Sequence, residues 1–252
     1  MQISPDQALA AASSRLRSTL AAKPELLIAG ATGVLGNAVL MRLSGTGRYA
    51  HTQVLAREPM QQGLQAISLQ LVAGELAQWP ALAQRCDVAV VMFEPPRMFY
   101  ERERALWTPI PAQLPALAQW LHTQGARTLA VVLPHVQGTL PEALKAGLAS
   151  LDEHALASIG FDRLIIVRSA EKSAAFASAN PLEKLAHWML GIFKFMIPSQ
   201  EQPVRPSKLA EIVDAALQYV PQGITVLGPQ QVWALTQLES KALVESVAKL
   251  GG

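Results

Sequence analysis

Short apolar runs alternate with longer amphipathic stretches along the 252-residue chain. The runs are nearly continuous in Val, Leu and Ile, which is typical of parallel strands buried on both faces. Expected strands cover residues 25–30, 52–57, 69–74, 87–93, 128–134 and 163–169, with 223–229 as one further candidate. Expected helices cover residues 34–44, 79–84, 112–124, 141–159, 181–196 and 207–219. The alternation predicts repeated βα units in one doubly wound parallel α/β sheet.

The chain shows no internal repeat or low-complexity linker, so we expect one domain overall. Residues 1–24 are interpreted as an N-terminal helical extension, residues 25–170 as the core, and 171–252 as a small C-terminal helical lobe packed on it. The least regular segment, residues 94–111, has the sequence EPPRMFYERERALWTPIP. Its prolines and charges predict a loop over one edge of the sheet. In such sheets the ligand crevice lies at the carboxyl ends of the strands.

Composition narrows the classes of function. Half of the residues are hydrophobic and 16% are charged, which suits a large buried core. The net charge is +2 and the basic residues are spread out, so we expect no nucleic-acid partner. The single cysteine, Cys86, cannot form an internal disulfide, and this favours a reducing compartment such as the cytoplasm. The histidines are scattered without ligand spacing, so no metal site is expected.

The most apolar segment lies at residues 185–197, with the sequence LAHWMLGIFKFMI. It falls short of the roughly 18 uncharged residues of a membrane span and contains Lys194. The N-terminal residues also lack the apolar centre of a signal peptide. We therefore expect no integral membrane segment. Residues 182–197 are expected to be a core element, a homodimer surface or a surface for a protein partner, and docking on a membrane surface stays open as an alternative.

Three glycines follow the first expected strand in the sequence AGATGVLG, residues 29–36. Gly30 permits a tight exit from the strand, and Gly33 lets the backbone approach a pyrophosphate closely. Gly36 removes bulk where the next helix lies against the sheet. The free N–H groups and the dipole of that helix favour a bound anion. The pattern predicts a dinucleotide site, and a turn that merely packs is the alternative.

The sequence GATGVLG resembles the nucleotide-binding motif of the extended and atypical short-chain dehydrogenase/reductase superfamily, especially its NmrA-like, NAD(P)H-binding members. Residues 71–76, LVAGEL, are similar to the family segment after the third strand, with Glu75 where the family usually has Asp. Residues 151–170 are similar to a family helix and strand, although Ser169 and Ala170 replace the usual Pro-Gly. Residues 203–217 resemble the family's late helix.

The resemblance implies an NAD(P)-binding Rossmann fold. The implied cofactor-binding positions are Gly30, Thr32, Gly33, Val34, Leu35, Gly36, Arg57, Glu75, Phe93, Leu133 and Pro134.

Arg57 stands at the end of the second expected strand, where NAD-binding proteins usually carry an acidic residue for the ribose hydroxyls. A guanidinium suits a 2′-phosphate, so NADP(H) is favoured over NAD(H). Glu58 follows directly and could serve a ribose hydroxyl, and Arg57 could also be a plain surface residue.

Reductases of this superfamily use a Tyr with a Lys four residues later on one helix face. The three tyrosines are followed at that distance by other residues: Tyr49 by Gln53, Tyr100 by Arg104 and Tyr219 by Gly223. The expected Tyr and Lys positions fall near Gly147 and Leu151. Leu133, Pro134 and His135 stand where the family has serines. The usual acid/base pair is therefore missing.

Two replacements for the missing acid are possible. His135 follows a strand that ends in the crevice, and an imidazole titrates near neutral pH. The alternative is a structural or exposed histidine. Tyr100 with Arg104 has the required spacing if residues 97–106 are helical, although this charged stretch also fits a solvated face or an interface.

These features lead to two main hypotheses about function. The first is an NAD(P)(H)-binding protein without the Tyr/Lys pair that acts as a cofactor-dependent sensor or scaffold. The second is an NADPH-dependent oxidoreductase for quinones, enones or carbonyls, in which the cofactor carries the hard step. A sugar-nucleotide epimerase is a third class, suggested only by the glycine motif.

Overall fold

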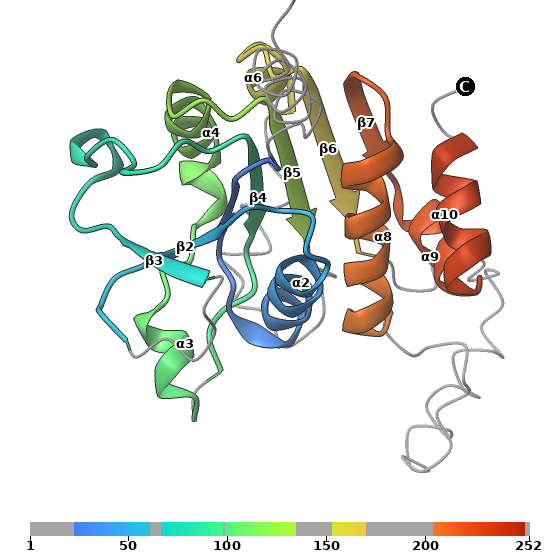
Figure 1. Cartoon of the computed structure of the whole chain (residues 1–252), viewed down its shortest axis with the longest axis horizontal. Helices are drawn as coiled ribbons and strands as arrows, with labels where there is room; N and C mark the ends of the chain where they lie inside the picture. The colour runs from blue at the N-terminus through green and yellow to red at the C-terminus, as the bar shows by residue number, and fades with distance from the viewer. Residues whose placement is uncertain (1–22, 61–66, 98, 135–152, 170–203, 250–252) are drawn as a thin grey trace, which may run out of the picture.

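The computed structural model describes residues 23–60, 67–97, 99–134, 153–169 and 204–249. A seven-stranded sheet, parallel throughout, forms its centre (Figure 1). The strands are β1 (Leu26–Ala29), β2 (Thr52–Ala56), β3 (Ile67–Leu71), β4 (Val88–Met92), β5 (Thr128–Leu133), β6 (Arg163–Arg168) and β7 (Gly223–Leu227), in the spatial order β3-β2-β1-β4-β5-β6-β7. The predicted doubly wound parallel α/β fold is confirmed, including the seventh strand, and β3 begins two residues earlier than expected.

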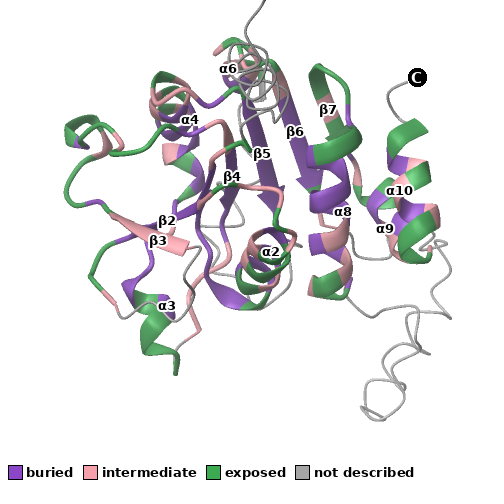
Figure 2. Ribbon diagram, in the orientation of Figure 1, coloured by how far each residue is buried: buried purple, intermediate pink, exposed green. Residues whose placement is uncertain are grey.

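Helices cover both faces of the sheet. They are α2 (Gly33–Gly45), α3 (Glu101–Ala105), α4 (Leu114–Thr123), α6 (Glu153–Ala157), α8 (Pro206–Tyr219), α9 (Pro229–Thr236) and α10 (Ser240–Ala248), with short 3₁₀ turns η1 (Leu76–Gln78) and η2 (Pro111–Gln113). Successive residues of β1 point to opposite faces, because side chains alternate along a strand. Leu26 and Ile28 join a core with α2 and α8, whereas Leu27 and Ala29 join a core with α4. The central strands are buried and β3 is only half-buried (Figure 2).

One expected helix is wrong. Residues 79–84 form no helix, and only the 3₁₀ turn η1 precedes them. Trp79 has an extended backbone because the residue before a proline is kept out of the helical region, and Pro80 follows it. The Trp79 side chain instead packs edge-to-face against Trp107 and Trp120, with ring centroids 4.8 and 5.2 Å apart. Burial of the indole therefore favours an extended conformation in this stretch, although the periodicity of its side chains indicated a helix.

The C-terminal part of the chain contributes to the same sheet. β7 pairs with β6, and α8 packs against α2. The division of the chain near residue 170 stays a prediction. The C-terminal lobe was expected to be helical, and α9 and α10 are helices there for which no bounds were predicted. Of the expected helix at 141–159, the structure describes α6. Residues 1–22 of the expected N-terminal extension and residues 181–197 lie outside the described residues. No described helix combines the length and apolar character that crossing a bilayer requires.

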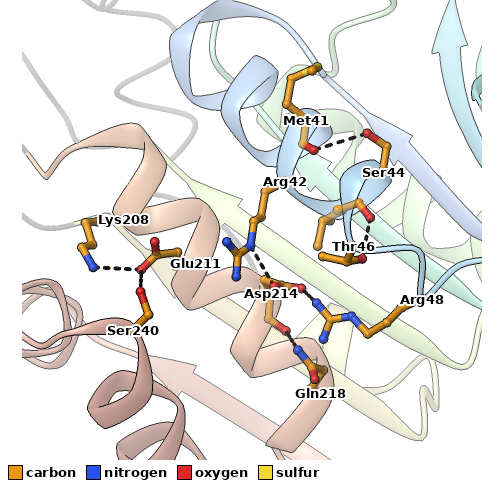
Figure 3. Close-up of polar contacts among 11 residues, drawn as sticks. Met41, Arg42, Ser44, Thr46, Arg48, Lys208, Glu211, Asp214, Gln218 and Ser240 are labelled. Carbon is orange, nitrogen blue, oxygen red and sulfur yellow. Dashed lines mark hydrogen bonds and ion pairs between the residues drawn. The ribbon is translucent and has the colours of Figure 1, made fainter. Parts of the chain in front are cut away.

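Helices α2 and α8 are joined by a buried carboxylate. Asp214 on α8 is 2% exposed and accepts a hydrogen bond from Arg42 Nε at 2.9 Å and another from Arg48 Nη2 (Figure 3). Both arginines are partly exposed, so removing the aspartate leaves cations that water can still solvate in part.

The substitution Asp214→Ala is therefore expected to lower the free energy of unfolding by about 2 kcal/mol, because two charge-assisted hydrogen bonds are lost. Chemical denaturation of the variant and of Glu245→Ala, an exposed control on α10, measures this. Equal stability of the two variants would show that this cluster adds nothing to the α2–α8 contact.

Candidate functional site

The glycine turn after β1 has two residues in the left-handed region. Gly30 has φ +77° and Gly33 has φ +71°. A Cβ on Gly30 would overlap the carbonyl oxygen of Met92, at the end of the neighbouring strand β4. A Cβ on Gly36 would lie 2.7 Å from the Gly30 carbonyl oxygen. Packing of the turn therefore requires glycine at positions 30 and 36 whatever the turn binds.

Two carboxylates accept hydrogen bonds from the amides of this turn. The Gly33 N–H donates to Glu103 Oε2 at 2.9 Å, and the Leu35 N–H donates to Glu94 Oε2 at 2.6 Å. The Thr32 hydroxyl donates to the Glu94 carbonyl oxygen, and a Cβ on Gly33 would overlap the Glu94 side chain. The amides at the start of α2 thus donate to carboxylate oxygens that the chain itself supplies, and binding of a dinucleotide there stays a prediction.

Sheet topology explains how Glu94 reaches the turn. β1 and β4 are parallel neighbours, with Ala29 paired to Val91, so the residues that follow the two strands lie at one edge. Glu94 comes two residues after β4 and is half-buried there.

Glu103 reaches the turn from α3 and is 6% exposed. Its Oε1 accepts from Arg97 Nε at 2.7 Å and from Arg97 Nη2, and its Oε2 accepts from the Arg97 backbone N–H at 2.9 Å as well as from Gly33. Both oxygens of Glu103 are therefore fully used as acceptors.

The two carboxyl groups have opposite pKa shifts. Burial raises the pKa of Glu94 above its usual range, although the backbone amides of Leu35, Val34 and Gly36 partly oppose this. Burial also acts to raise the pKa of Glu103, but hydrogen bonds from Arg97 and Gly33 outweigh it and hold that pKa below the usual range.

We expect Glu94 to titrate at a higher pH than Glu103, and carbon-detected NMR of the side-chain carboxyls would measure both midpoints. By linkage, Glu103 stabilises the fold above the pKa of an unfolded glutamate, and this stabilisation is lost as pH falls through its lower folded pKa. Glu94 has the opposite sign, because its contribution is present below the unfolded pKa and is lost as pH rises through its higher folded pKa. If Glu103 titrated at a higher pH than Glu94, the hydrogen-bond partners described here for the two carboxyl groups would be contradicted.

The backbone after α3 lies against the carboxyl ends of β1 and β2. The Trp107 N–H donates to the Leu55 carbonyl at 2.9 Å, and the Gly30 N–H donates to the Trp107 carbonyl at 3.1 Å. The Arg57 N–H donates to the Ala105 carbonyl at 2.7 Å. Ala56 and Leu106 form an antiparallel bridge. Residues 105–107 therefore lie at the carboxyl ends of β1 and β2, beside the β1–β4 switch point at which sheets of this type bind ligands.

The side chains of this backbone stretch are anchored in both cores. Leu106 packs in the core of α2 and α8, whereas Trp107 packs in the core of α4 and is 7% exposed. The Thr108 hydroxyl lies 3.2 Å from the Thr32 hydroxyl. The segment is thus bound to the sheet by hydrogen bonds and by apolar burial together.

The structure brings part of the predicted cofactor set together. The turn residues and Arg57 lie at one edge, with the Arg57 side chain exposed and its backbone held by Ala105. Val34 is 48% exposed, and Glu75 is exposed at the start of η1. The positions at the ends of β4 and β5 are buried: Phe93 and Leu133 pack in the α4 core, and Pro134 follows. A cofactor role for each of these residues stays a prediction.

The structure describes some of the candidate acids and not others. His135 and the positions Gly147 and Leu151 lie outside the described residues. Burial raises the pKa of Tyr49 to about 12, so its phenol stays protonated at neutral pH. Tyr219 is 44% exposed at the end of α8.

The cation beside Tyr100 is Arg97, whereas the sequence had suggested Arg104. The Arg97 guanidinium lies 3.8 Å from the centroid of its ring, whereas Arg104 pairs with Glu101 at 3.8 Å.

Two further groups bear on chemistry. Burial raises the pKa of the Cys86 thiol to about 12, which keeps it out of nucleophilic chemistry. Within the described ranges, no three His, Cys, Asp or Glu side chains are grouped to hold a metal ion.

Glu94, Arg97 and Glu103 were not predicted as site residues, because residues 94–111 were expected to form a covering loop. A sequence pattern could have indicated Glu94: it follows a buried strand, and the ends of parallel strands share an edge with the glycine turn. No such pattern marks Glu103 in the sequence, because its contact with the glycine turn depends on how residues 94–111 fold back over the sheet.

No protein-family model matches the chain, and no curated protein matches it either. Solved structures similar to it include triphenylmethane reductase of Citrobacter sp. complexed with NADP(H), at 14% identity and a TM-score of 0.46, covering 80% of this chain and 68% of that one. ADP-L-glycero-D-manno-heptose-6-epimerase of Helicobacter pylori is 14% identical with a TM-score of 0.45, covering 86% and 82%. The enzyme WbmH of Bordetella bronchiseptica, in complex with NAD⁺, is 13% identical with a TM-score of 0.39, covering 89% and 96%. These likenesses concern the fold and do not extend to a ligand or a reaction.

Proposed function

We propose that the protein binds a nicotinamide dinucleotide at the glycine turn and acts as a cofactor-dependent sensor or scaffold. The supporting observation is that the Gly33 and Leu35 amides donate to carboxylate oxygens in this structure. The same donors suit the oxygens of a diphosphate, and the dipole of α2 favours either anion. The dinucleotide would be held by the turn, and residues near the end of β2 would contact its ribose.

The sensor role follows from which groups a dinucleotide would meet. A diphosphate on these amides takes the positions of the Glu94 and Glu103 oxygens, so binding moves residues that belong to the surface segment containing α3. Cofactor occupancy is then coupled to the shape of that surface, and by linkage a partner that prefers one shape changes cofactor affinity. A partner or homodimer surface at residues 182–197 stays part of this proposal, and a reducing compartment such as the cytoplasm fits the buried thiol of Cys86.

NADP(H) is the preferred cofactor in this proposal because the Arg57 side chain is exposed at the end of β2. Isothermal titration calorimetry with NADPH, NADP⁺, NADH and NAD⁺ tests both binding and preference. Saturable heat with at least one of the four is expected, and its absence at millimolar concentrations would argue against the function. Arg57→Ala should weaken NADPH binding about ten-fold with little change for NADH, because a charge-assisted contact to the 2′-phosphate is lost. Arg127→Ala, an exposed change next to the amino end of β5, serves as its control.

The alternative function is an NADPH-dependent oxidoreductase for quinones, enones or carbonyls. β5 ends at Leu133, so the chain approaches the crevice edge directly before His135. When bound, the cofactor would supply the hydride, and His135 would hold the proton for a carbonyl oxygen. NADPH consumption over a panel of quinones, aldehydes and enones distinguishes the two functions, and His135→Ala should abolish any turnover. A turnover that survives this substitution would remove His135 from the mechanism.

A further inference from the structure

We propose that the chain carries its own occupant of the dinucleotide crevice, and that this latch has to leave before a dinucleotide can bind. The latch consists of Glu94, Arg97 and residues 99–109. The inference rests on the proposed function, and it adds a means of regulating the same site.

The latch uses the hydrogen-bond donors that a dinucleotide needs. Glu103 and Glu94 occupy the amides of Gly33 and Leu35, with donor–acceptor distances of 2.9 and 2.6 Å. An amide proton that is held at such a distance by one carboxylate is not available to a phosphate oxygen. Two anions at one helix start would also repel each other. Binding of the ligand and closure of the latch therefore exclude each other.

The latch also covers the carboxyl ends of β1 and β2. Its backbone exchanges hydrogen bonds with Gly30, Leu55 and Arg57 through Ala105 and Trp107. The last described pair between β1 and β2 is Ile28 with Val54, and the latch adds its own bridge at Ala56. The C-terminal end of the latch is also close to Gly30, since a Cβ on Gly30 would lie 3.1 Å from Pro109 Cδ. The latch thus contacts the sheet along the same edge as the predicted cofactor positions.

The latch also contains the cation that balances the charge of its buried carboxylate. Arg97 neutralises Glu103 through two side-chain hydrogen bonds, so a buried carboxylate is placed on the turn together with its cation. The tip beyond Arg97 buries little, because Phe99 is 92% and Tyr100 is 52% exposed. Release of the tip therefore exposes little additional apolar surface, and the polar contacts of Glu94 and Glu103 determine how tightly this part stays closed.

Glu103→Gln tests the latch with almost no change in side-chain volume. Both oxygens of Glu103 accept only, so an amide NH₂ at either position would face the donors of Arg97 or of Gly33. The closed state is weakened and the open state is unchanged. We expect the variant to bind NADPH about ten-fold more tightly or better in calorimetry. The control is Glu101→Gln, the same substitution on the same helix at a side chain that is 91% exposed, and it should stay within about two-fold of the unaltered protein.

The outcomes separate the latch from the function. Equal NADPH affinity in the unaltered protein and in Glu103→Gln would overturn the latch and leave the dinucleotide function standing. Absence of binding by all three proteins would refute the dinucleotide function, and the latch with it. Tighter binding by Glu103→Gln alone supports both.

Hydrogen exchange tests the latch in the unaltered protein, so the result does not depend on whether a variant folds. With saturating NADPH, peptides covering residues 99–104 should exchange faster, because this exposed tip loses the contact that Glu103 makes with the turn. Peptides covering residues 30–36 should exchange more slowly, since the turn gains a ligand. Slower exchange in both regions would show that the latch stays closed on the bound cofactor and would overturn the inference.

Discussion

Gly30→Ala is expected to lower the free energy of unfolding by about 3 kcal/mol or more. Two costs add together at this position. The backbone has φ +77°, which costs an alanine about 1–2 kcal/mol, and the new methyl group would overlap the Met92 carbonyl oxygen in β4. That oxygen belongs to the backbone of a central strand, so it cannot move aside as a side chain would. Denaturant unfolding followed by circular dichroism measures the loss.

Gly47→Ala separates these two costs. Gly47 has φ +64°, and a Cβ there would meet no atom within 4 Å, so only the backbone cost applies. We expect a loss of about 1 kcal/mol. If both variants lost the same stability, the close approach of β1 to the end of β4 would have no energetic role. The glycine at position 30 would then reflect backbone conformation alone.

Trp107→Ala is expected to lower the free energy of unfolding by about 3–5 kcal/mol, the range for removing a large buried aromatic side chain. The indole is 7% exposed and lies edge-to-face on Trp79, with ring centroids 4.8 Å apart. Its removal leaves a cavity between the segment that covers the crevice and the core of α4. Chemical denaturation with a fluorescence readout would measure the effect, since Trp79 and Trp120 remain as probes.

Trp107→Phe is the matched control, because it keeps an aromatic ring against Trp79 while removing part of the volume. We expect a cost of about 1–2 kcal/mol. A phenylalanine variant as unstable as the alanine variant would mean that the indole as such is required. A stable alanine variant would mean that the segment is held by its backbone hydrogen bonds alone.

The sequence predicted the strands well because each is a local apolar run bounded by turn residues. β1, β2, β4, β5 and β6 lie within one or two residues of their expected bounds. The helix at 79–84 failed because its residues satisfy the periodicity while the Trp79–Pro80 pair enforces an extended backbone and the indole is buried against two other tryptophans. Periodicity describes a side-chain pattern and does not account for such a contact.

The candidate site was predicted in part. The tight turn at Gly30 and the start of a helix after it were expected from local backbone requirements, and the structure confirms both. The left-handed conformation of Gly33 was not predicted. The expected loop at 94–111 contains the short helix α3. Glu94 and Glu103 lie on the turn instead of facing solvent, whereas Glu101 is exposed. Charged residues near a glycine turn are normally assigned to the surface, since burial of a carboxylate is costly without partners. Arg97 and the turn amides are those partners.

The amino-acid sequence by itself determined where the chain forms a strand, where it turns tightly and where the first amides of α2 lack a partner within the helix. These are properties of neighbouring residues, and glycine conformations and apolar runs encode them locally. Only the tertiary structure decided what those amides contact. Glu94 is 59 residues from Leu35 and Glu103 is 70 residues from Gly33, so their meeting depends on β4 lying beside β1 and on the return of the chain through α3. Local patterns carry no information about such pairs, because the free energy of the contact arises only once the sheet has brought both segments to one edge.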